Sequence, residues 1–119
     1  MQPVSINYDG KVFCSVKNSE AGDVSPATLF YYHQQEDVFW AEYSGGDILR
    51  GFMIGLVHPD GRLEFNYQHL NKGKAIRLGK CCSRPEITPD GKVRLYENWQ
   101  WLDNDQQKGS SIVEEQKQQ

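Results

Sequence analysis

Turn signals recur along this chain at short intervals, and they limit every regular element to a few residues. Asp-Gly occurs at residues 9–10, 60–61 and 90–91, and further glycine-containing turns are expected at 44–47 and 71–74. In the second and third Asp-Gly turns a proline comes first, which presets one turn angle, while the glycine accepts a positive φ. A chain with this spacing of turns favours short strands joined by tight hairpins.

Eight segments rich in β-branched and aromatic residues lie between or beside the turns. We expect strands at Val12–Lys17, Leu29–Gln34, Val38–Tyr43, Ile48–Val57, Leu63–Leu70, Ala75–Ser83, Val93–Leu102 and Ser111–Glu115. No window of about a dozen residues carries the apolar stripe of a helix, which argues against a parallel βαβ sheet. One turn of helix is expected within Asn18–Pro26.

Short strands that follow one another without long connections predict an antiparallel meander. An open meander leaves two unpaired edges, and closing it into a barrel removes them. We therefore predict an all-β fold, a single eight-stranded antiparallel meander closed as a small β-barrel, with a split β-sandwich as the alternative. Residues 1–119 form one domain, and residues 1–9 and 116–119 are expected to fray.

Charge and hydropathy argue against some classes of binding partner. The net charge is −3, which argues against a nucleic-acid binder. No apolar run approaches the ~20 residues of a membrane span, and no basic-then-apolar leader is present, so we expect no membrane partner.

The cysteines Cys14, Cys81 and Cys82 are too few and too oddly spaced for a disulfide framework or a zinc site. We expect three reduced thiols, a cytoplasmic location and no cofactor; a redox or metal role for the adjacent pair is the alternative.

The segment Val93–Leu102 shows most clearly which side chains face the interior. One face carries Arg94, Tyr96, Asn98 and Gln100, and the other carries Leu95, Glu97, Trp99 and Trp101. Because side chains alternate along a strand, the second face must be the core. This alternation places the carboxyl of Glu97 inside the barrel.

The same alternation predicts an aromatic interior with a few polar groups. The inward residues include Phe30, Gln34, Ala41, Leu49, Gly51, Met53, Gly55, Val57, Leu63, Phe65, Gly79 and Cys81. The candidate ligand-binding residues among the inward set are Tyr32, Tyr43, Tyr67, His69, Arg77, Glu97, Trp99 and Trp101. Two interpretations remain open. The polar groups satisfy one another in a filled core, or they converge on a small-molecule pocket with aromatic walls.

Motifs that carry catalytic chemistry are absent from the sequence. It contains no GxSxG, P-loop, HExxH or GxGxxG pattern, so no catalytic residue is assigned. His33 and His58 are expected at the surface, and only His69 inside. A buried carboxylate needs a partner, and we expect Arg77, on the preceding strand, to pair with Glu97.

An apolar stripe is left on the outside of the predicted barrel. If the glycine-rich face of Ile48–Val57 is inside, the outward face carries Ile48, Phe52, Ile54 and Leu56, beside Trp40. Stripes of this kind mark interfaces, and two-fold pairing is the commonest way to cover them. We therefore expect a homodimer or a higher homo-oligomer.

Several motifs together resemble a known family over nearly the whole chain. They are Tyr43-Ser-Gly-Gly-Asp-Ile, Gly51-Phe-Met-Ile-Gly55, Pro85-Glu-Ile, Asp90-Gly91-Lys-Val-Arg-Leu and Glu97-Asn-Trp-Gln-Trp101, together with Asn18-Ser19-Glu20 and Tyr32-His-Gln34. These residues are similar to a family of short bacterial proteins that often carry the label N-acetylglutamate synthase. The resemblance implies a barrel like that of avidin and supplies no catalytic residues.

The synthase label can be tested against the sequence. An acetyltransferase of the usual kind holds coenzyme A with a glycine loop at a helix start. The nearest match, Gln106–Ser111, ends in serine and precedes no predicted helix. We therefore expect a non-catalytic barrel that binds a small, unidentified ligand. The alternatives are a filled barrel that acts through protein–protein contacts and, disfavoured, the synthase.

Overall fold

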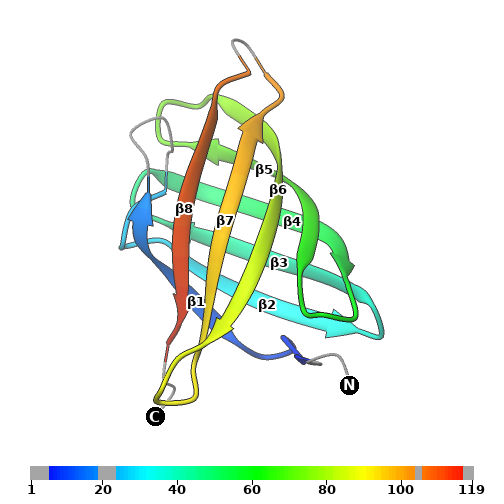
Figure 1. Cartoon of the computed structure of the whole chain (residues 1–119). Coiled ribbons are helices and arrows are strands. Elements are labelled where there is room, and N and C mark those ends of the chain that lie inside the picture. Colours follow the sequence, from blue (N-terminus) through cyan, green and yellow to red (C-terminus); the bar gives the residue numbers. More distant parts are fainter. Residues whose placement is uncertain (1–5, 19–23, 104–105, 117–119) are drawn as a thin grey trace.

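The chain forms a closed eight-stranded antiparallel barrel. The computed structural model describes residues 6–18, 24–103 and 106–116. Its strands are β1 (Val12–Asn18), β2 (Leu29–Gln35), β3 (Val38–Gly45), β4 (Ile48–Val57), β5 (Leu63–Asn71), β6 (Ile76–Ile87), β7 (Val93–Trp101) and β8 (Lys108–Glu115). Each strand pairs with the next, and β8 pairs with β1 to close the barrel (Figure 1). The predicted meander and its closure are confirmed, and the split sandwich is wrong.

The strand ends differ from the prediction where local pairing overrides composition. β6 continues past Ser83 to Ile87, because residues 84–87 still pair with β7 although they have left β5 behind. Pro85 is tolerated there because its missing N–H faces the side without a partner strand. β8 begins at Lys108 rather than Ser111. Asn18 ends β1, and residues 24–28 contain no helix; the rest of the expected helical turn lies outside the described residues.

The barrel interior is aromatic along most of its length. Fully buried side chains include Tyr8, Phe13, Tyr32, Phe39 and Leu95. The rings of Phe13 and Tyr32 pack in a tilted arrangement with centroids 4.5 Å apart, and the ring centroid of Tyr8 lies 6.0 Å from that of Tyr32. These contacts leave the half of the barrel nearest the β2–β3, β4–β5 and β6–β7 connections tightly packed.

The segment before β1 plugs this packed end. Tyr8 is wholly buried, and its hydroxyl donates to the carbonyl of Gly61 at 2.6 Å. The backbone N–H of Tyr8 donates to Oε1 of Gln34 at 2.9 Å. The expectation of a frayed amino terminus is therefore wrong at Tyr8, because an aromatic ring that fills the barrel end orders the backbone around it. Gln34 lies at this rim, half-buried, and not deep in the interior.

Three glycines, two on β4 and one on β6, lie opposite large aromatic residues on the neighbouring strand. Tyr43 pairs with Gly51, Phe65 with Gly55, and Tyr67 with Gly79. A Cβ added at Gly51 or Gly79 would overlap the ring of Tyr43 or Tyr67, and one added at Gly55 would overlap Phe65 Cβ and the carbonyl of Glu64. The rings of Tyr43 and Tyr67 thus occupy the space that their cross-strand glycines leave empty, which confirms that the glycine face of β4 points inward.

One end of β4 departs from the predicted faces. Ile48 is buried and Leu49 is 39% exposed, the reverse of the expectation. The pairing of β4 with β5 shifts register between Ile48 and Arg50. A β-bulge of this kind moves the flanking side chains to the opposite faces of the sheet.

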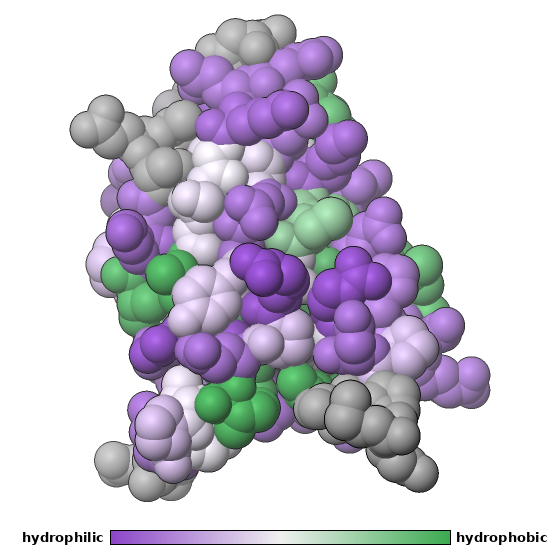
Figure 2. Space-filling model, in the orientation of Figure 1, coloured by the Kyte–Doolittle hydropathy of each residue, from purple (hydrophilic) through white to green (hydrophobic). Residues whose placement is uncertain are grey.

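The outer surface divides into a polar and an apolar region. Figure 2 shows mostly hydrophilic residues over β7 and β8, with small separate green areas. The strands β3, β4 and β6 carry an apolar outer face, which we define as Val38, Trp40, Phe52, Ile54, Leu56 and Leu78, all of them exposed. The predicted outward orientation of Phe52, Ile54 and Leu56 is confirmed. Within the described part of the chain, no helix is long and apolar enough to cross a membrane.

Candidate functional site

A row of polar side chains crosses four strands inside the barrel. Asn18 of β1 pairs with Ser111 of β8, Ser111 pairs with Glu97 of β7, and Glu97 pairs with Ser83 of β6. Register pairing places the four residues at one level of the barrel wall. Ser83, Glu97 and Ser111 are buried and Asn18 is half-buried, so the polar row faces the interior.

Glu97 is the centre of this polar row. Ser111 Oγ donates to Glu97 Oε1 at 2.7 Å, and Ser83 Oγ donates to Oε2 at 3.4 Å. Burial disfavours the charged carboxylate and raises the pKa of Glu97 to about 7, although both serine hydrogen bonds oppose the rise. Glu97 is therefore poised to gain or lose a proton near neutral pH.

Arg77 does not pair with Glu97, so that prediction is wrong. Its guanidinium lies 3.9 Å from the ring centroid of Trp101 and donates to Asp103 at 3.0 and 3.3 Å. Asp103 follows β7 at the barrel end and also accepts the backbone N–H of Leu78. A long, partly exposed arginine stacks on an aromatic face and keeps its charge near water, whereas pairing with Glu97 would bury that charge.

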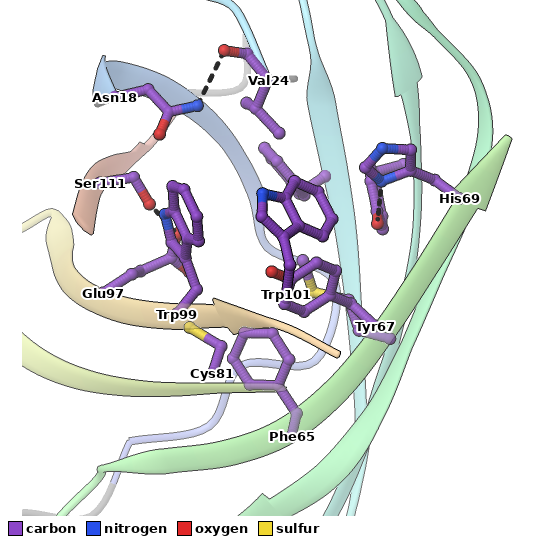
Figure 3. Close-up of a pocket in the computed structure, with 13 residues that line it drawn as sticks. Asn18, Val24, Phe65, Tyr67, His69, Cys81, Glu97, Trp99, Trp101 and Ser111 are labelled. Carbon is purple, nitrogen blue, oxygen red and sulfur yellow. Dashed lines mark hydrogen bonds between the residues drawn. The ribbon is translucent and has the colours of Figure 1, made fainter. Parts of the chain in front are cut away.

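Aromatic side chains form most of the remaining wall. Trp99 and Trp101 lie 5.6 Å apart, and Tyr67 lies edge-on to Trp101 at 5.5 Å. Tyr43 Oη is 2.8 Å from His69 Nδ1 across the wall. Figure 3 shows Glu97 and Ser111 to one side of the two indoles and Tyr67 and His69 to the other.

These walls enclose a cavity at the end of the barrel opposite the Tyr8 plug. Its volume is about 50 Å³, and its lining also includes Val24, Phe30, Met53, Phe65 and Cys81. A water molecule needs only about 10–15 Å³ of such space, so the cavity holds a few water-sized groups. It is smaller than the roughly 300–1,000 Å³ typical of drug-sized ligand sites. The interior is therefore largely filled, with a small cavity beside the polar row.

Six of the eight candidate residues from the sequence line this cavity: Tyr43, Tyr67, His69, Glu97, Trp99 and Trp101. Arg77 lies behind Trp101. Tyr32 packs with Phe13 and Phe39 in the core, and its buried hydroxyl has no hydrogen-bond partner among the described residues. Binding of a ligand by these residues stays a prediction.

Three residues of the polar row are not among the residues predicted from the sequence. Ser83 continues the inward alternation of Gly79 and Cys81, so extending that pattern by two residues finds it. Ser111 and Asn18 carry no comparable signal, because Ser111 begins an expected strand and Asn18 directly follows one. Only the closure of β8 on β1 brings them beside Glu97.

The remaining histidines lie apart from this cavity, whereas Cys81 is part of its lining. His33 and His58 are at the surface, where they contact Glu42 and Glu64. Cys81 is buried and Cys82 exposed, as the alternation predicts, and the cysteines are unpaired. Among the described residues, no three histidine, cysteine or acidic side chains group closely enough to hold a metal ion.

The fold and the cavity define a class: a small closed meander barrel that is plugged at one end and carries an aromatic, acid-containing cavity at the other. The family model described as avidin-like protein matches residues 6–116. The chain belongs to the avidin-like protein family. No curated protein and no solved structure gives a significant match.

Proposed function

We propose that this protein is a non-catalytic barrel that binds a small molecule in the cavity beside Glu97. The observation that carries the proposal is an amphipathic cavity. Three members of the polar row, Asn18, Glu97 and Ser111, line one side of it, and an aromatic wall lines the other. Sites for small molecules combine largely apolar walls with a few convergent polar groups.

An unpartnered polar atom supports binding at this end of the barrel. Asn18 Nδ2 donates to the carbonyl of Val24 at 2.9 Å, which leaves Oδ1 as the free end of the amide. That oxygen is buried without a hydrogen-bond partner in the described part of the chain. A buried acceptor left unsatisfied costs about 1–3 kcal/mol, and a ligand donor would remove this cost.

The apolar outer face favours a second role in self-association. Six large side chains are exposed on adjacent or nearby strands, from Val38 to Leu78. We propose that a second copy of the chain covers them in a homodimer or higher oligomer. A barrel acting only through such contacts is the second candidate function, and the small size of the cavity favours it.

The cysteines bear on the cellular location of the protein. Three unpaired thiols, one of them exposed, suit a reducing compartment, and we propose the cytoplasm. Acetyl transfer is disfavoured, because the sequence lacks the glycine loop that would hold coenzyme A.

Tryptophan signals give a direct test of ligand binding. The chain has three tryptophans, two at the cavity and Trp40 on the outer face. A metabolite library is screened by thermal shift, and hits are followed through the indole N–H resonances. We expect a true ligand to shift the signals of Trp99 and Trp101 and leave Trp40 in place. A library without any hit, or hits that move only Trp40, would contradict the proposal.

A further inference from the structure

The polar row offers a ligand mainly hydrogen-bond acceptors. The hydroxyl protons of Ser111 and Ser83 are both directed to Glu97. A carboxylate has about four lone-pair positions, so capacity remains on its two oxygens. Asn18 adds the unpartnered Oδ1, which Figure 3 shows directed toward Ser111. A complementary ligand must therefore bring N–H or O–H donors.

The charge of Glu97 has no protein counter-ion in the described residues. In the part of the chain that the structure describes, no ion pair joins Glu97 to a lysine, arginine or histidine, and Arg77 pairs with Asp103 and stacks on Trp101. The titratable groups that face it are Tyr32 of β2, Tyr67 of β5 and Cys81 of β6, whose pKa values are all raised, with burial the main cause and Glu97 adding to it. None of these three groups can carry positive charge.

Two further titratable groups complete the surroundings of the cavity. Tyr43 and His69, from β3 and β5, contact each other across the wall. Neither makes a hydrogen bond or an ion pair with Glu97. An ionised Glu97 is thus buried beside the cavity with only two serine hydroxyls to stabilise it, and a cation in the cavity would complete the charge balance.

The aromatic wall suits the same kind of ligand. The faces and edges of Trp99, Trp101 and Tyr67 lie around the cavity. Aromatic faces attract ammonium and guanidinium groups, and the attraction grows when water is excluded. A cavity of about 50 Å³ limits the group to a few heavy atoms.

We propose that the cavity binds the protonated nitrogen of a small organic amine, with Glu97 as its counter-ion and Asn18 Oδ1 as a second acceptor. This inference rests on the proposed function of the cavity and names the class of its ligand. The amine binds as a cation with N–H donors, between the acidic row and the indoles. No covalent step is involved.

Matched four-carbon probes test the charge requirement. n-Butylamine, 1-butanol and butyrate are titrated at pH 8 while the indole N–H signals are followed. We expect the amine to bind at least tenfold more tightly than the alcohol and to shift Trp99 and Trp101, and we expect butyrate not to bind. Equal or tighter binding of 1-butanol would overturn the amine inference but leave the binding function intact. Silence from all three probes and from the metabolite library would overturn both.

Two variants and a pH series assign the effect to Glu97. Glu97→Gln keeps the side-chain shape and should abolish the preference for the amine, whereas Glu64→Gln, on the outer surface, should leave it unchanged. In the wild-type protein, amine affinity should fall as the pH drops below 7, because protonation of Glu97 removes the counter-ion. Because the pH series uses the wild-type protein, it tests the role of Glu97 even if the Glu97→Gln variant fails to fold. An amine preference that survives Glu97→Gln, or that is constant from pH 8 to pH 5, would overturn the inference.

Discussion

Glu97 has no cationic partner among the described residues, and this arrangement distinguishes it from the charged pairs on the outside of the barrel. Arg94 and Glu114 meet at the surface, as do Lys11 and Glu115. Glu97 instead has only the hydroxyls of Ser83 and Ser111. A salt bridge stabilises only the ionised carboxylate, whereas two neutral hydroxyls can hydrogen-bond to the carboxyl in either protonation state. Glu97 can therefore gain or lose its proton while the hydrogen bonds across the barrel wall remain.

Stability should therefore depend on pH through Glu97. Its pKa is about 7 in the folded barrel against an ordinary 4.5, so the folded state binds more protons between these values. The contribution to the unfolding free energy is fully present below about pH 4.5 and is lost as the pH rises through 7. The loss is roughly 2–4 kcal/mol at about 1.4 kcal/mol per pKa unit. Urea denaturation from pH 4.5 to 8 measures it.

The control for this prediction is the neutral isostere. Glu97→Gln should remove this part of the pH dependence, while Glu64→Gln should retain it. If both variants follow the wild-type profile, another group is responsible for the dependence.

At the scale of the strand, aromatic rings facing glycines set the shape of the interior. The ring of Tyr67 covers Gly79 and also lines the cavity next to Trp101. The strand pairing thus positions the cavity wall directly, because the Tyr67 ring can pack over β6 only where the opposite residue lacks a Cβ.

Gly79→Ala should disturb both stability and the cavity. The new methyl would displace the Tyr67 ring or the β7 backbone at Gln100, and overpacking of this kind costs about 1–3 kcal/mol. Chemical denaturation measures the loss, and the indole signal of Trp101 should shift. Gly73→Ala is the matched control, because its Cβ would meet only Asn71 Oδ1 at 3.3 Å. Equal stability of the two variants would contradict the ring-over-glycine account.

Strand faces could be predicted wherever alternation was strict. Val93–Leu102 has one polar and one apolar face, which was enough to place Glu97 inside. Leu49 was misplaced because the register shift of a bulge has no signature in composition. The Glu97–Arg77 pair was expected from sheet order alone, but an arginine near a strand end can reach out of the barrel to Asp103. Tyr8 lies in a segment without any periodicity, so its role as a plug depends on tertiary contact.

At the scale of the whole molecule, the apolar outer face remains uncovered in the single chain. Ile54 is 65% exposed and lies directly opposite Trp40 on the neighbouring strand. Exposed apolar surface of this kind is uncommon on monomers, and pairing with a second copy of the chain is the commonest way to bury it.

Sedimentation tests the expected self-association. The wild-type protein should sediment as a dimer or larger species at micromolar concentration, and Ile54→Glu should convert it to a monomer. Ile87→Glu, at another exposed apolar position outside this face, should leave the assembly unchanged. A wild-type monomer at high micromolar concentration would contradict self-association.

The first and last described residues lie at the same end of the barrel as the Tyr8 plug, and this position matters for fusions and surface attachment. Ile6, the first described residue, lies near Gly61 and Pro85, and the last, Gln116, hydrogen-bonds to Val12. Both lie at the plugged end of the barrel, where β1 begins and β8 ends (Figure 1). A fluorescent fusion or a sensor-chip tether joined at either terminus would therefore leave the cavity end facing solution.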